Sequence, residues 1–318
     1  MIDHRWPKAS LLALLVVAAT TGTLLAQFDP LGGGADDAKV FRMRYKVGVV
    51  VTARTNCQGI YATIPVPSDW PEQVVRVAAE DVSQSARVKS LAPSDGVPQM
   101  AVTIPFLPAG QSAQALVTYD IERRPLPPPA EPDTLVVPRR LPLAMRRHLG
   151  DSPFIEKRHG DIRGRATAIL KEHSEATAWR QVEAIYDWVR DNVKESPGKL
   201  KGAVAALRDG AGNNEDRTSL FIALCRASDV PARTVWIPDS CYAEFLLADA
   251  SGEFHWLPCR LTGEREFGQT DCEMPVLQKG DNFRVPQQRE AVRYMPEFLK
   301  GAGGSPDVDF VRMPLPAG

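Results

Sequence analysis

One stretch, "GNNEDRTSLFIALCRASDVPAR" at residues 212–233, decides the fold of this 318-residue chain. Its middle places apolar residues at three- and four-residue steps, which predicts a buried helix. The Gly and Asn residues before that helix suit a turn and an N-cap. Pro231 then blocks further helix, and the run "ARTVWIP" predicts a strand. The stretch therefore predicts a buried helix that leads directly into a β-strand.

The residues at the N-terminal end predict export. Arg5 and Lys8 precede an apolar run at residues 10–26 that is broken only by small residues and threonines. A basic flank followed by a short apolar stretch is typical of an export signal. We expect residues 1–26 to be a signal peptide or a membrane anchor and residues 27–38 to be a flexible linker. The remainder is then extracytoplasmic (periplasm, cell envelope or secreted), with a membrane contact only if the first segment is retained.

The rest of the chain divides by its periodicity. Alternating, β-branched runs separated by turn signals predict an antiparallel β-sandwich over residues 39–124. The proline-rich residues 125–142 predict a semi-rigid linker. A helical period then begins, so we expect a second, α+β domain over residues 143–300. Residues 301–318 are expected to form a tail that adds an edge strand.

The composition excludes several functions. The formal net charge is -1, with 44% hydrophobic and 24% charged residues, which is typical of a globular chain with a sizeable core. Such a balance gives no reason to expect nucleic acid as a partner. No cluster has metal-ligand spacing and no glycine-rich loop would cradle a phosphate, so we expect no metal and no cofactor.

The opening stretch and two later motifs resemble the transglutaminase-like superfamily, which has the papain-like fold of transglutaminases and bacterial cysteine proteases. The motif positions that agree are Gly212, Asp216, Leu220, Phe221, Ala223, Leu224, Cys225, Arg226, Ala227, Pro231, Ala232 and Arg233. The later motifs correspond to "SCYAEFLL" from Ser240 and "HWLPCRLTGEREFG" from His255. The resemblance spans residues 161–268 and implies an α+β, papain-like core preceded by an antiparallel β-sandwich.

The departures from the family pattern fall on its chemistry. Where the family has a Cys nucleophile, a His base and an orienting Asp, this chain has Asn214, Ser240 and Arg260. An amide is neither nucleophilic nor titratable near neutral pH. Serine cannot act as the base, and an arginine would repel an imidazolium. The loss of one such part typically costs about three to four or more orders of magnitude in rate. We therefore expect no catalytic residue at these positions, although an enzyme with other groups stays open.

The resemblance also implies a cysteine pair. If the family geometry holds, Ser240 and Arg260 face each other across neighbouring strands. Cys241 and Cys259 would then face each other on the opposite side of the sheet. Such a separation in an exported protein suits a disulfide, and the alternative is a pair of packed thiols.

Three aromatic residues are expected near the family's cleft, namely Trp236, Tyr242 and Trp256. They would either line a peptide-binding groove or pack in the core. These features predict a catalytically inactive transglutaminase-like protein that binds a peptide or a cell-envelope protein. The alternative is an active transglutaminase-like cysteine protease, amidase or acyltransferase with a non-standard nucleophile. A third hypothesis is a spacer without a ligand, and the sequence leaves open whether a partner protein supplies catalytic residues.

Overall fold

The computed structural model describes residues 39–94, 96–285 and 288–315. The signal or anchor at residues 1–26 and the linker at residues 27–38 lie outside these residues, so both stay predictions. Within the described part of the chain, no helix is long and apolar enough to cross a membrane.

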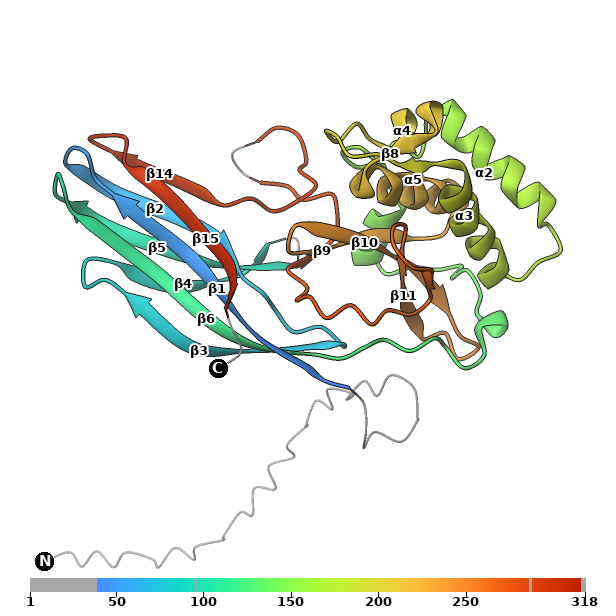
Figure 1. Cartoon of the computed structure of the whole chain (residues 1–318), viewed down its shortest axis with the longest axis horizontal. Coiled ribbons are helices and arrows are strands. Elements are labelled where there is room, and N and C mark those ends of the chain that lie inside the picture. The colour runs from blue at the N-terminus through green and yellow to red at the C-terminus, as the bar shows by residue number, and fades with distance from the viewer. Residues whose placement is uncertain (1–38, 95, 286–287, 316–318) are drawn as a thin grey trace, which may run out of the picture. The chain divides into compact units, whose positions relative to one another are not determined.

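Two four-stranded antiparallel sheets are built from both ends of the described chain (Figure 1). The strand order is β15-β1-β6-β3 in one sheet and β14-β2-β5-β4 in the other. Their bounds are β1 (Phe41–Thr52), β2 (Cys57–Pro65), β3 (Gln73–Val82), β4 (Arg87–Ser94), β5 (Val97–Leu107), β6 (Ser112–Arg123), β14 (Phe298–Ala302) and β15 (Asp307–Leu315).

Alternate side chains of these strands form one buried cluster. It takes Val49 from β1 and Ala115 from β6 in one sheet, and Ile64 from β2 and Ile104 from β5 in the other. The period of two therefore buries one face of each sheet, as the sequence pattern predicts. The antiparallel strands are confirmed, whereas a self-contained sandwich at residues 39–124 stays a prediction. The last strands, β14 and β15, are paired with β2 and β1.

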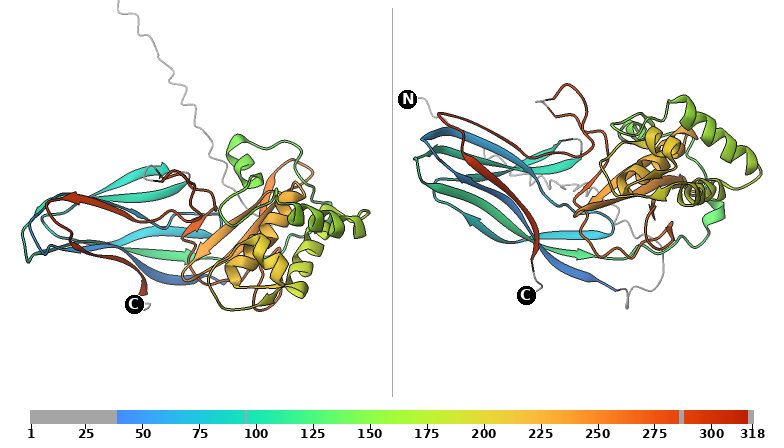
Figure 2. Two further views of the ribbon diagram at one scale, coloured as in Figure 1. Left: turned by 90° about the horizontal axis from the view of Figure 1, so that it is seen from above. Right: turned by 45° about the horizontal axis from the view of Figure 1, so that its top comes forward.

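Helices cover one face of a third sheet, which has the strand order β12-β11-β10-β9-β13 (Figures 1 and 2). The helices are α1 (Leu143–Arg146), α2 (Gly160–Glu172), α3 (Ala178–Asn192), α4 (Ala203–Asp209) and α5 (Asn214–Ala227), with short 3-10 turns at Pro132–Thr134 and Arg147–Leu149. The strands are β9 (Ala232–Ile237), β10 (Ser240–Ala248), β11 (Phe254–Arg260), β12 (Glu266–Phe267) and β13 (Gln278–Lys279), and β7 (Lys194–Glu195) pairs with β8 (Ala211–Gly212). The α+β class is confirmed.

Helix α5 is the centre of this region. It contacts α2, α3 and α4 on one side and β9 and β10 on the other, and residues 216–226 are buried throughout. Asn213 caps the helix in a reciprocal capping box with Asp216. A Cβ at Gly212 would lie 2.7 Å from the Cβ of Asp216, so this close approach requires glycine. The family-like Gly and Asp of the motif thus fix the start of α5.

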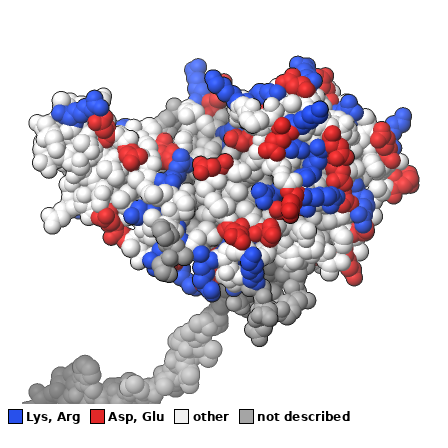
Figure 3. Space-filling model, viewed as in Figure 1, with Lys and Arg blue, Asp and Glu red and all other residues white. Residues whose placement is uncertain are grey.

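A buried network of charges joins the two sheets to the helical region. Lys279 Nζ lies 2.7 Å from Glu72 Oε1 and 2.6 Å from Glu244 Oε1. Arg233 lies 2.7 Å from the second oxygen of Glu244, and Arg123 lies 3.4 Å from Glu72. These pairs are shielded from solvent and are therefore screened little by salt. On the outer surface of the helical region, Figure 3 shows charges of both signs interspersed.

Candidate functional site

Asn214 and Ser240, which stand where the family has its Cys and His, meet at the N-terminal end of α5. Asn214 Nδ2 donates hydrogen bonds to Ser240 Oγ at 2.9 Å and to the Cys241 carbonyl oxygen at 2.8 Å. The capping box sets the start of α5, and the tight turn at Asp239, with φ 56°, brings Ser240 to the start of β10. The structure therefore places Asn214 and Ser240 together, as the resemblance implies.

The side chain that completes the group around Asn214 is Thr262 and not Arg260. Thr262 Oγ1 donates a hydrogen bond of 3.1 Å to Asn214 Oδ1. Arg260 instead pairs with Glu266, at 3.1 Å between Nη1 and Oε1. The expectation that Arg260 faces Ser240 is corrected by the strand register, since β11 pairs Cys259 with Ala243. Sequence reasoning missed Thr262 because a two-residue register offset between β10 and β11 has no sequence signal.

The same register corrects the cysteine expectation. Cys241 is paired with Trp236 of β9, and Cys259 is paired with Ala243 of β10, so the two cysteines do not face each other. All five cysteines are free and buried. Of the two readings, the structure shows packed thiols rather than a disulfide.

Thiol chemistry is suppressed at this site. Cys241 Sγ lies 3.9 Å from Asn214 Nδ2, yet burial, together with Glu215, raises the pKa of its thiol to about 12. Burial likewise raises the pKa of Cys225 and of Cys259 well above the ordinary thiol range. A thiolate is the reactive form of cysteine, so these groups are poor nucleophiles near neutral pH.

The histidines of the described residues all make their contacts away from Asn214. His148 is buried against Trp256, with ring centroids 5.2 Å apart, and burial and Arg233 lower its pKa well below 6.5. His159 caps α2, and His173 follows the last turn of that helix. His255 Nε2 lies 3.0 Å from Asp249 Oδ2. In the described chain, therefore, the side-chain partners of Asn214 include no imidazole.

The three aromatic candidates have different surroundings. Trp236 is buried, and its Nε1 donates a 2.8 Å hydrogen bond to the carbonyl oxygen of Gly280. Tyr242 is fully buried, and its hydroxyl accepts a 3.0 Å hydrogen bond from Arg123. Trp256 is half-buried beneath the Arg233 guanidinium, whose carbon lies 3.9 Å from the ring centroid. Tyr242 thus packs in the core, whereas Trp256 presents part of its ring to solvent.

Asp249, Glu253 and His255 form the group of side chains that could hold a metal ion in the described chain. Their ligand atoms lie within 4.8 Å of one another, at the turn between β10 and β11. Asp249 already accepts hydrogen bonds from the Ser251 hydroxyl and from the backbone of Glu253. These contacts explain the cluster as a hydrogen-bonded turn.

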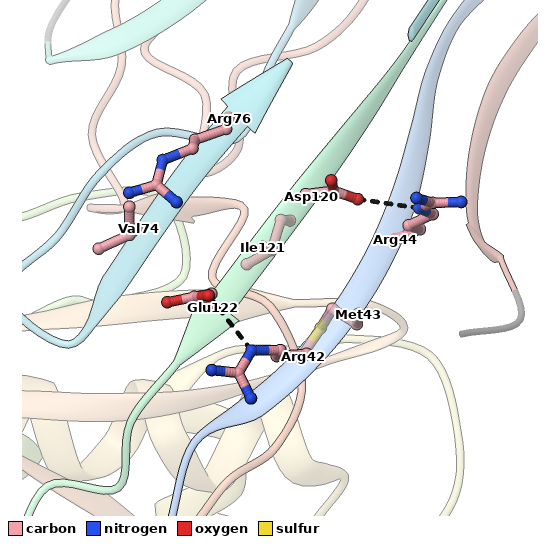
Figure 4. A pocket seen from close by; sticks show the side chains of 8 residues that line it. All are labelled: Arg42, Met43, Arg44, Val74, Arg76, Asp120, Ile121 and Glu122. Atoms are coloured by element: carbon pink, nitrogen blue, oxygen red, sulfur yellow. Dashed lines mark hydrogen bonds and ion pairs between the residues drawn. The ribbon is translucent and has the colours of Figure 1, made fainter. Parts of the chain in front are cut away.

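A pocket of about 270 Å³ lies on the outer face of the β1-β6-β3 sheet. Figure 4 shows its two cross-strand ion pairs, Arg42 with Glu122 at 3.2 Å and Arg44 with Asp120 at 2.9 Å. Exposed pairs of this kind are typical of a solvated sheet surface. The pocket is not formed by any residue of the Asn214 site.

Comparison with known proteins supports the class that the geometry indicates. Residues 163–261 match the family model described as "Transglutaminase-like superfamily". A solved structure described as a putative cysteine protease from Cytophaga hutchinsonii aligns with 88% of this chain and 94% of its own, at 15% identity and a TM-score of 0.53. A putative protease from Parabacteroides distasonis aligns with 73% of this chain and 48% of its own, at 12% identity and a TM-score of 0.27, which carries no argument.

No curated protein matches the chain. Residues 163–261 therefore form a transglutaminase-like core, and the chain shares its fold with a putative cysteine protease. At 15% identity the likeness concerns the fold alone.

Proposed function

We propose that this protein is a non-catalytic member of the transglutaminase-like class that binds an extended peptide or a cell-envelope protein at the N-terminal end of α5. One observation carries the proposal. Asn214, Ser240 and Thr262 form a neutral hydrogen-bonded group where the family has its charged triad. All three side chains are partly exposed, so a ligand can reach them.

The chemistry of these groups supports binding rather than bond cleavage. Asn214 uses both of its amide N–H groups within the site, whereas the Ser240 hydroxyl can still donate a hydrogen bond and the Thr262 hydroxyl oxygen can still accept one from a ligand. Such groups hydrogen-bond a peptide backbone but cannot form a thioester intermediate. A cysteine enzyme needs a thiolate and a base within hydrogen-bond reach, whereas the nearest thiol, that of Cys241, is buried and has a raised pKa.

The proposal includes a location outside the cytoplasm. It is supported by the basic flank and apolar run at residues 10–26, which are typical of an export signal.

The test is a binding and turnover measurement on one set of samples. The purified protein is incubated with an array of extended peptides, bound peptides are measured by calorimetry, and their masses are recorded afterwards. Ser240→Trp places a bulky ring at the site, and Ser251→Trp is the matched control because Ser251 lies at an exposed turn.

We expect intact peptides, with binding that is lost in Ser240→Trp and kept in Ser251→Trp. Peptide cleavage or cross-linking that iodoacetamide abolishes would favour the active-enzyme alternative. Failure to bind any peptide of the array would overturn the proposed role and favour a spacer without a ligand.

A further inference from the structure

Arg293 lies in an unusual setting beside the Asn214 site. It belongs to the connection between β13 and β14, which returns from the helical region to the two sheets (Figure 1). Its side chain is 11% exposed, and its Nη2 lies 3.2 Å from Glu215 Oε2. Glu215 directly follows Asn214, so the contact joins this connection to the first turn of α5.

Two aromatic rings lie close to the Arg293 guanidinium. The Arg293 guanidinium carbon is 5.1 Å from the Trp236 ring centroid and 5.5 Å from the Phe154 ring centroid. Cations are attracted to aromatic faces within about 6 Å. Glu215, Trp236 and Phe154 therefore form a cation box, with one carboxylate and two rings contributed by three separate segments.

The backbone at Phe154 shows that one wall of the box is held in an uncommon conformation. Phe154 has φ 66°, a left-handed value that is rare for a bulky residue. Backbone hydrogen bonds between Ser152 and Ile155 close the turn around it, and the ring is 40% exposed. The Trp236 ring is held by the hydrogen bond from its Nε1 to the carbonyl oxygen of Gly280.

Arg293, which fills the box, leaves most of its hydrogen-bonding capacity unused. In the part of the chain that the structure describes, Arg293 Nε, Nη1 and Nη2 are buried and make no well-aligned hydrogen bond, although Nη2 lies within ion-pair distance of Glu215. Guanidinium groups have five N–H donors, and a buried donor without an acceptor is unfavourable because it has lost its hydrogen bonds to water. The box thus holds a cation by charge and aromatic faces alone, while Glu215 keeps 39% of its side-chain surface exposed.

We infer that Glu215, Trp236 and Phe154 form a receptor for a cationic side chain, and that Arg293 fills this receptor in cis. An external peptide with Arg or Lys would enter the box when Arg293 leaves it. The inference rests on the proposed binding role of this end of α5 and adds the ligand's chemistry.

The first experiment empties the box and refills it. Nα-acetylarginine amide is titrated into Arg293→Ala, with the neutral Nα-acetylcitrulline amide as the matched probe, and binding is followed by calorimetry and by melting temperature. We expect the arginine probe to bind and to raise the melting temperature, and the citrulline probe to bind at least about tenfold more weakly. Arg293→Ala combined with Glu215→Gln should lose the difference, and the unsubstituted protein should bind neither probe at the same concentration.

A second measurement avoids the vacated variant in case it does not fold. Glu215→Gln in the otherwise unchanged chain should speed amide hydrogen exchange at residues 291–295, whereas Glu253→Gln, at an exposed turn, should not. Equal binding of both probes, or of neither, together with unchanged exchange in Glu215→Gln, would overturn the receptor. Because the probe is a single amino acid, this result is independent of whether any longer peptide binds at Ser240.

Discussion

At the scale of the residue, Asn214 links three segments of the chain through one amide side chain. A thiol at a helix N-terminus is activated by its surroundings, whereas an amide there is satisfied by them. Asn214 donates to Ser240 and to the Cys241 carbonyl oxygen and accepts from Thr262. Its side chain therefore ties α5 to β10 and to the segment after β11, which a cysteine could not do as well.

Asn214→Ala should lower the free energy of unfolding by about 1–3 kcal/mol, since several polar partners lose their hydrogen bonds together. Urea denaturation provides the measurement. Asn192→Ala is the matched control because its exposed amide bonds only to the Trp188 carbonyl oxygen, and it should change stability by less than about 0.5 kcal/mol. Equal losses in the two variants would contradict the assigned role of Asn214.

The buried thiol of Cys241 makes stability depend on alkaline pH. Its pKa is about 12 in the fold against an ordinary value of 9.0, so the folded state keeps a proton that the unfolded state loses. The contribution is complete below pH 9 and is lost as pH rises towards 12. Cys241→Ala should show a shallower fall in unfolding free energy above pH 9, by up to about 1.4 kcal/mol per pH unit. Identical pH slopes would contradict the burial of this thiol.

At the scale of the element, α5 and its neighbouring strands could be predicted in part. The apolar period predicts the helix, and Pro231 predicts that it ends before β9. The predicted proximity of Asn214 and Ser240 agrees with their hydrogen bond. The register of β10 against β11 could not be predicted, because alternation fixes which face a residue occupies but not a two-residue offset along the strand. That offset moved the third contact from Arg260 to Thr262.

The ion pairs around Glu244 give the prediction at this scale. Burial alone would raise the pKa of Glu244, but Lys279 and Arg233 lower it to about 2. Glu244→Gln removes the negative charge that pairs with Lys279 and Arg233, so it should lower the free energy of unfolding by about 3–5 kcal/mol. Asp120→Asn, which breaks an exposed pair with Arg44, should cost at most about 1 kcal/mol.

The Glu244 carboxylate also makes the free energy of unfolding depend on acidic pH. Because its folded pKa lies below the ordinary 4.5, the stabilisation by Glu244 is complete above pH 4.5 and is lost as pH falls through 2. Unfolding titrations of Glu244→Gln and of the unsubstituted protein between these values should converge at low pH. Parallel curves would contradict the ionised state of the buried carboxylate.

At the scale of the whole molecule, the chain closes on itself. β15 pairs with β1 from Arg44 opposite Leu315 to Thr52 opposite Asp307, so the end of the described chain lies on its first sheet. The sequence suggested an edge strand in this region but could not name its partner, since pairing over such a separation leaves no local pattern. The buried pairs of Glu72 and Arg123 with the helical region add a second long-range closure.

A chain that ends at Gly304 lacks β15 and should have a lower melting temperature and a tendency to associate. The reason is that β1 becomes an open sheet edge, which pairs readily with other chains. Calorimetry and light scattering measure both effects, and Val308→Ala in the full chain, at an exposed position of β15, should change neither. An unchanged melting temperature in a monodisperse truncated protein would show that the closure is dispensable.

The central claim is that a transglutaminase-like core has lost cysteine chemistry and kept a site. Its most direct test is turnover of a mixed peptide substrate set by the purified protein, followed by mass spectrometry with and without prior iodoacetamide treatment. The account predicts no cleaved or cross-linked product in either sample and slow alkylation of all five buried cysteines. Product that forms in the untreated sample and disappears after alkylation would contradict it.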